Sequence, residues 1–134
     1  MTTKEDIFNY VKEMQDRNGN DEEYFPIYSI FLFTNPDKEM IYENGDLPIH
    51  SGFPDIGASL NAGFYYDIDC AISAMNHNGC DIHEYCYNAG FVLCRFPGLY
   101  SACGQYSRMY FLWDEEKQGF FQKEEPEIFH HVAY

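Results

Sequence analysis

The last third of the chain constrains the fold most, because apolar runs rich in aromatic residues alternate there with short turn signals. Gly90 to Phe96 and Ser107 to Trp113 have the composition of β-strands, and a third, shorter run follows at 120–121. The hexapeptide DEEKQG at 114–119 is the turn between the second and third runs. Strands joined by short turns pair antiparallel, so we expect an antiparallel sheet here.

The first third of the chain predicts one helix and one strand. Residues 3–16 are expected to be helical, with Thr3 as N-cap and Asp6 completing a capping box. Tyr24 to Thr34 is rich in aromatic and β-branched residues and predicts a strand, with Pro26 placing its start at a sheet edge or outside the hydrogen-bonded ladder. The apolar residues expected to share one face of the helix are Ile7, Phe8, Val11 and Met14.

The middle of the chain predicts a second strand and helix after a long connection. Residues 44–59 hold three Gly and two Pro and predict an irregular loop, preceded by a short strand at 40–42. Leu60 to Tyr66 predicts a strand, and Asp67 then caps a helix over 68–77. A short helical turn at 81–87 and a last strand or docked segment at 127–134 complete the expected elements.

This order of elements predicts an α+β fold. We expect a single domain over residues 1–134, with one antiparallel sheet of about five or six strands and two helices packed on one face.

The charge and composition of the chain exclude some classes of function. The 134 residues include 22 acidic and 8 basic ones, for a net charge of −14, and no Lys or Arg occurs from Glu39 through Cys94. Eight bases are too few for a general nucleic-acid binder, because affinity for nucleic acid depends on neutralising phosphates. Aromatic residues make up 19 % of the chain, which excludes a disordered acidic tail.

An ordered series of motifs lies between Gly63 and Glu127: GFYYDIDCAISAM, CDIHEYCY, PGLY, FLWDEEKQGFF and EEPE. The series covers about half of the chain and resembles a family of short uncharacterised acidic proteins of gut-type Firmicutes phages and mobile elements. Its most specific piece is WDEEKQGF at 113–120. The resemblance implies no activity. It implies a context in which small accessory proteins bind and block a host protein.

Metal and thiol chemistry are the enzymatic alternatives. The ligand types of a zinc site recur every three residues, but standard zinc modules place two ligand pairs well apart in sequence. The five cysteines lie in acidic or apolar sequence, which raises a thiol pKa and disfavours a nucleophile. We therefore expect no enzyme activity, no metal and no cofactor, and keep a small zinc-binding domain as a further alternative. Its ligands would be His77, Cys80, His83 and Cys86.

A second alternative is a sponge that sequesters a small signalling nucleotide. Arg95 and Arg108 are two of the few bases in the C-terminal half, and Tyr106 lies between them in sequence. Guanidinium groups bind phosphate and aromatic rings stack on bases. These three residues are the candidate ligand site of this alternative.

The main hypothesis is a non-enzymatic, anti-CRISPR-like nucleic-acid mimic. Carboxylates on a folded scaffold copy the negative field of a nucleic-acid backbone and attract a basic surface of a bacterial defence protein, with a CRISPR effector nuclease as the leading example. No signal peptide or membrane span is visible, so we expect a protein of the bacterial host cytoplasm without direct nucleic-acid or membrane contact; a homodimer stays open. The candidate partner-binding residues are Asp21, Glu22, Glu23, Asp81, Glu84, Asp114, Glu115 and Glu116.

Overall fold

The structure is a computed structural model of the whole chain. It describes residues 1–19, 23–33, 49–50, 53–54, 59–77, 87–98 and 106–125. The strand expected at 40–42, the helical turn expected from 81 and the segment expected at 127–134 lie outside the described residues, apart from Tyr87.

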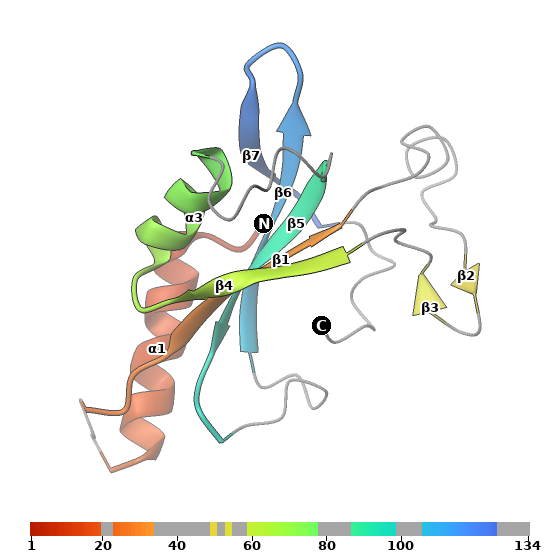
Figure 1. Cartoon of the computed structure of the whole chain (residues 1–134). Helices are drawn as coiled ribbons and strands as arrows, with labels where there is room; N and C mark the ends of the chain where they lie inside the picture. The colour runs from red at the N-terminus through yellow and green to blue at the C-terminus, as the bar shows by residue number, and fades with distance from the viewer. Residues whose placement is uncertain are drawn as a thin grey trace.

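Five strands form one antiparallel sheet, as predicted (Figure 1). The strands are β1 (Ile27–Phe33), β4 (Ser59–Tyr65), β5 (Ala89–Arg95), β6 (Tyr106–Asp114) and β7 (Gly119–Lys123). Their order in the sheet is β4-β1-β5-β6-β7, and every neighbouring pair is antiparallel. The N-terminal strand β1 therefore lies inside the sheet, and Pro26 directly precedes its ladder.

A second, small pair of strands lies within the stretch that was expected to be an irregular loop. β2 (Ile49–His50) and β3 (Phe53–Pro54) pair antiparallel, with Ile49 opposite Pro54 and His50 opposite Phe53. The prediction of an unbroken loop over 44–59 is wrong at these four residues, because two-residue strands carry no periodic apolar signal.

The first helix, α1 (Lys4–Arg17), begins at the capping box expected from the sequence. Thr3 Oγ1 accepts a hydrogen bond from the Asp6 backbone N–H at 3.1 Å, and Asp6 Oδ2 accepts one from the Thr3 N–H at 2.8 Å. These two bonds satisfy donors that a helix start leaves without partners. The helix ends at Asn18, its C-cap.

The second helix, α3 (Ile68–Asn76), is capped by Asp67 as predicted. Asp67 Oδ1 accepts hydrogen bonds from the backbone N–H groups of Asp69 at 2.7 Å and Cys70 at 3.1 Å. Neither described helix is long and apolar enough to cross a lipid bilayer.

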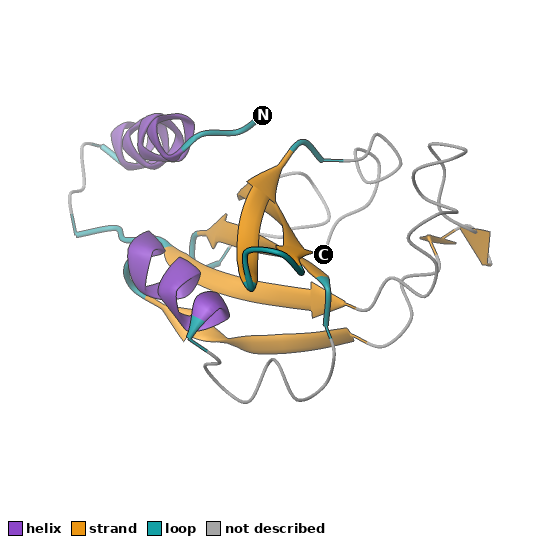
Figure 2. Ribbon diagram, turned by 90° about the horizontal axis from the view of Figure 1, so that it is seen from above, coloured by secondary structure: helices purple, strands orange, loops and turns teal. Residues whose placement is uncertain are grey.

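Both helices pack on the same face of the sheet, as predicted (Figure 2). Phe8 departs from the expectation: its side chain is 53 % exposed and takes no part in this core. Phe8 is one position beyond the stripe that Ile7 and Met14 bury, and a helix turns by about 100° per residue. The buried residues of this core are Ile7, Tyr28, Ile30, Leu32, Ala62, Ile68, Ala71, Met75, Val92, Cys94, Met109, Phe111 and Phe120.

The opposite face of the sheet is also apolar in its centre. Phe33, Phe91 and Leu93 are fully buried there, with Ala89 and Tyr110 beside them. The rings of Phe33 and Phe91 pack in a tilted arrangement with 5.9 Å between their centroids, as do those of Phe91 and Tyr110 at 5.3 Å. Neither described helix lies on this face, yet its residues alternate with those of the helix-facing core along β5 and β6.

Candidate partner-binding surface

The turn between β6 and β7 holds three of the predicted partner-binding carboxylates. Asp114 Oδ1 accepts hydrogen bonds from the backbone N–H groups of Glu116 at 2.9 Å and Lys117 at 3.1 Å. Gln118 has a positive φ of 52° and its Nε2 donates to the Glu115 carbonyl at 2.6 Å. The turn is therefore held by its own side chains, and Glu115 and Glu116 are exposed at its tip.

The hairpin that carries this turn extends beyond the ends of β1 and β5, at the top of the view in Figure 1. On one side of it, the Lys117 ammonium lies 5.1 Å from the centroid of the Phe121 ring, which is 40 % exposed. On the other side, Trp113 packs edge-on against Phe120 at 5.2 Å. The single base of the turn is thus directed to an aromatic ring, a cation–π contact.

Glu23 lies at the other end of the sheet from this turn. The register aligns Ile27 with Arg95 and Arg95 with Tyr106, the first residue of β6. Glu23 precedes Ile27 by four residues, whereas Asp114 is the last residue of β6. The structure therefore brings Asp114, Glu115 and Glu116 together and separates them from Glu23, which is exposed.

Four other predicted partner-binding residues lie outside the described part of the chain: Asp21, Glu22, Asp81 and Glu84. Of the 22 acidic residues, ten lie there, but only one of the eight basic residues does. The described part of the chain is therefore less acidic than the composition of the whole chain implies.

The two arginines of the alternative ligand site point to the same face of the sheet, away from the helices. Arg95 is paired with Tyr106, and Arg108 with Leu93, so the arginines are diagonal neighbours on adjacent strands. The side chain of Tyr106 is not among those described. Arg108 is 11 % exposed, and its guanidinium lies 4.8 Å from the centroid of the Phe91 ring.

Arg108 Nε also forms an ion pair with the Glu125 carboxylate, which sequence reasoning missed. Glu125 is 20 % exposed, so this carboxylate neutralises a largely buried charge. A signal for it exists in the hairpin: Tyr110 pairs with Lys123. Continued by two residues, this antiparallel register places Arg108, two positions before Tyr110, opposite Glu125, two positions after Lys123.

The described thiols differ in environment. Cys94 is fully buried, and burial raises the pKa of its thiol from 9.0 to about 12. The thiol is hydrogen-bonded to the Tyr28 hydroxyl, whose pKa burial also raises. A thiol in this state is a poor nucleophile, because only the thiolate reacts. Cys70, by contrast, is exposed on α3.

His77 has a local structural role at the end of α3. It is the C-cap of that helix, and its Nδ1 lies 3.0 Å from Ser73 Oγ and 2.9 Å from the Ser73 carbonyl oxygen. Cys80, His83 and Cys86 lie outside the described residues. Within the ranges that the structure describes, no group of three or more His, Cys, Asp or Glu side chains is arranged to hold a metal ion.

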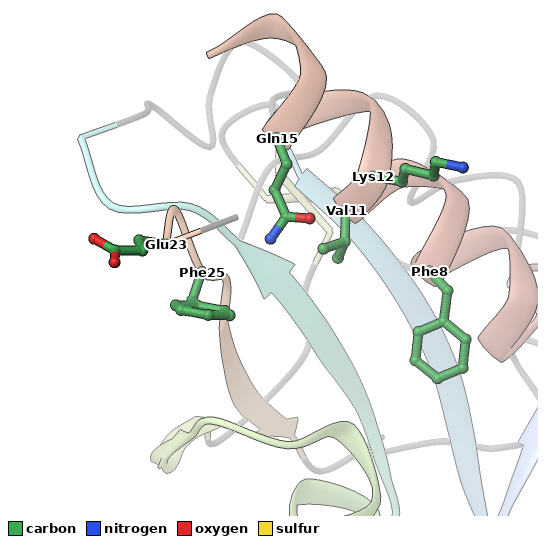
Figure 3. A pocket seen from close by; sticks show the side chains of 6 residues that line it. All are labelled: Phe8, Val11, Lys12, Gln15, Glu23 and Phe25. Atoms are coloured by element: carbon green, nitrogen blue, oxygen red, sulfur yellow. The ribbon is translucent and has the colours of Figure 1, made fainter. Parts of the chain in front are cut away.

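An open apolar groove of about 680 Å³ lies between α1 and the segment that leads into β1 (Figure 3). Gln15 Nε2 donates to the Tyr24 carbonyl at 3.0 Å and ties this segment to the helix. Phe8 and Phe25 are 53 % and 60 % exposed. The sequence pattern does not reveal the groove, because it predicts Phe8 on the buried face of the helix. The lining residues are Phe8, Val11, Lys12, Gln15, Glu23 and Phe25.

Comparison with protein-family models, with curated proteins and with solved structures finds no match to this chain. The resemblance of residues 63–127 to short proteins of phages and mobile elements stays a prediction.

Proposed function

We propose that the protein is a non-enzymatic binding protein that occupies a basic, nucleic-acid-binding surface of a bacterial defence protein. It would act in the host cytoplasm on behalf of a phage or mobile element, and a CRISPR effector nuclease is the leading candidate partner. The observation that supports this best is the self-bonded β6–β7 turn, which presents Glu115 and Glu116 at the tip of a projecting hairpin.

The turn suits such a partner because its backbone is held by hydrogen bonds before binding. Asp114 and Gln118 hold the backbone in place, so little backbone entropy remains to be lost when Glu115 and Glu116 meet cationic groups. The net charge of −14 adds long-range attraction to a basic surface and raises the association rate. Phe121 supplies an exposed aromatic contact beside the charged tip.

The direct test is inhibition of DNA binding by guide-loaded CRISPR effector nucleases. The purified protein is titrated into each complex with fluorescent target DNA, at low and at high salt. We expect inhibition by the wild type that weakens as salt is added, because screening reduces attraction between exposed charges. The variant Glu115→Lys/Glu116→Lys is expected to inhibit about tenfold less or worse, as when charge pairs at an interface are lost.

A matched control makes the same change in net charge elsewhere. Glu5→Lys/Asp16→Lys reverses two exposed acids near the two ends of α1, neither with a described side-chain hydrogen bond. The proposal is supported if the control variant still inhibits DNA binding and the tip variant no longer does. Equal weakening in both variants means that the overall negative charge acts without a specific site. Failure to inhibit any of the effectors refutes a CRISPR effector nuclease as the partner.

One observation favours the nucleotide sponge as a second candidate function. The register places Arg95 and Arg108 on the same face of the sheet, as diagonal neighbours. A ligand that binds only the folded state raises the melting temperature. We expect a panel of cyclic and linear nucleotides to include one that stabilises the wild type but not Arg95→Ala; a panel without any shift counts against this candidate.

A further inference from the structure

One stripe of α1 carries none of that helix's own acids, although Lys4 at its start is ion-paired with Asp69 of α3. At about 100° per residue, Lys4, Phe8, Lys12 and Gln15 fall within one third of the helix circumference, together with Val11. The four acids of the helix fall on its other sides: Glu5, Asp6, Glu13 and Asp16. This stripe is not suited to a basic partner, because it carries two lysines and none of the acids of the helix.

The same stripe forms one wall of the groove in Figure 3, and the segment before β1 forms the other. Val11 lines the groove from the α1 wall, and the half-exposed rings of Phe8 and Phe25 flank the opening. Exposed apolar surface that gathers in a groove marks an interaction site. The hydrogen bond from Gln15 to the Tyr24 carbonyl joins the two walls, so the groove is formed by the single chain.

The charges at the groove make it complementary to a second copy of itself. Lys12 and Glu23 stand on opposite walls, and their charged groups point outward in opposite directions. A two-fold axis that runs along the groove brings each rim of one copy to the opposite rim of the other, whereas an axis across the groove would bring like charges together. Lys12 of one copy then faces Glu23 of the partner subunit, and the reciprocal pair forms at the other rim.

We propose that this groove is the interface of a homodimer. Phe8 of each copy packs beside Phe25 of the partner subunit, and two reciprocal pairs of Lys12 and Glu23 flank the aromatic contact. The interface goes beyond the proposed function and does not depend on it, because the hairpin tip at 114–116 lies at the opposite end of the sheet from Glu23.

The dependence on salt distinguishes self-association through this interface from binding to a basic partner. Each copy carries a net charge of −14, so two copies repel each other over long range, and added salt screens this repulsion. The apolar contact does not weaken with salt, and exposed ion pairs contribute little. Dimerisation is therefore expected to tighten as salt rises, whereas inhibition of a basic partner weakens.

The experiment is sedimentation equilibrium of the purified chain at low and high salt. We expect a monomer–dimer equilibrium that favours the dimer at high salt. Phe8→Ser and Phe25→Ser should each weaken self-association about tenfold or more, as truncation of a central aromatic does. Phe64→Ser is the control, because Phe64 is 75 % exposed on β4, outside the groove.

A charge swap tests the pairing at the rims. Lys12→Glu and Glu23→Lys should each weaken the dimer, and the double variant Lys12→Glu/Glu23→Lys should restore it, since it keeps the net charge and exchanges the two partners. Circular dichroism confirms that each variant is folded. A chain that stays monomeric at every salt concentration overturns the proposal, as does a dimer that Phe25→Ser leaves unchanged.

Discussion

Asn76 and Phe120, 44 positions apart in the chain, are joined by one hydrogen bond: Asn76 Oδ1 accepts from the Phe120 backbone N–H at 2.8 Å. Asn76 is the last residue of α3, and Phe120 lies on β7, the strand at one edge of the sheet. An edge strand leaves backbone donors without a neighbouring strand. This bond satisfies one of them and fixes the hairpin with the acidic turn to the helical layer.

Asn76→Ala is expected to lower the free energy of unfolding by about 1–3 kcal/mol, because it leaves the N–H of the buried Phe120 without an acceptor. Urea unfolding followed by circular dichroism measures the loss. Asn9→Ala, at an exposed position of α1, is the matched control and should change stability by less than about 0.5 kcal/mol. Equal stabilities of the two variants would show that the bond contributes nothing.

Gly90→Ala is expected to be the more harmful of two glycine substitutions. A Cβ at Gly90 would lie 2.5 Å from Leu32 Cδ2 and 2.8 Å from the Phe31 carbonyl oxygen. Both atoms belong to the neighbouring central strand, so we expect a loss of about 2–3 kcal/mol or a failure to fold. Gly98 has open space around it but a φ of +84°, so Gly98→Ala should cost only about 1 kcal/mol. If urea unfolding shows a larger loss of stability for Gly98→Ala than for Gly90→Ala, the close packing at Gly90 is contradicted.

Glu125→Ala is expected to destabilise the protein by about 2–3 kcal/mol, because it leaves the largely buried Arg108 charge without its carboxylate partner. Lys4→Ala removes the ion pair between Lys4 and Asp69, whose side chains are 49 % and 68 % exposed. That change should cost less than about 1 kcal/mol. Urea midpoints of the two variants measure the difference, and similar losses would mean that Arg108 does not depend on Glu125.

Stability is expected to fall in alkaline solution. Burial raises the pKa of Cys94 from 9.0 to about 12 and that of Tyr10 from 10.0 to about 12. Above pH 9.0 the unfolded chain therefore binds fewer protons than the folded one. The stabilisation is complete below that pH and is lost as pH rises toward about 12. The slope approaches about 1.4 kcal/mol per pH unit for each group.

Urea unfolding between about pH 8 and pH 11 measures this slope. Cys94→Ala should start from a lower stability, because it empties part of the core, and then lose less with rising pH. Cys70→Ala, at the exposed thiol of α3, should leave the slope unchanged. Identical slopes for the wild type and Cys94→Ala would exclude the buried thiol as a cause.

The helix starts were predictable because the interactions that set them are local. Thr3 and Asp6, or Asp67 and Cys70, lie three residues apart, so the caps at Thr3 and Asp67 follow from spacing alone. The turn at 114–119 was predictable for the same reason, since Asp114 bonds to groups within three residues of it. The acidic tip is thus the part of the candidate site that sequence reasoning found.

The remaining features depend on which strands lie side by side. Arg108 and Glu125 meet only once the register of the β6–β7 hairpin is known, and nothing near Gly90 in sequence points to Leu32, because that contact forms only once the sheet has its strand order. Phe8 shows the same limit, since a small rotation of α1 about its axis decides whether the Phe8 side chain lies in the core or at the groove.

The amino-acid sequence by itself determined the two described helices, the five strands of the main sheet, the acidic turn and the excess of negative charge, since each of these rests on composition or on interactions within a few residues. Only the tertiary structure decided that β1 lies inside the sheet, that Arg95 and Arg108 share a face and that Phe8 and Phe25 flank one groove. The physical reason is that these relationships are long-range: they follow from the packing of the whole sheet, to which every strand and helix contributes at once.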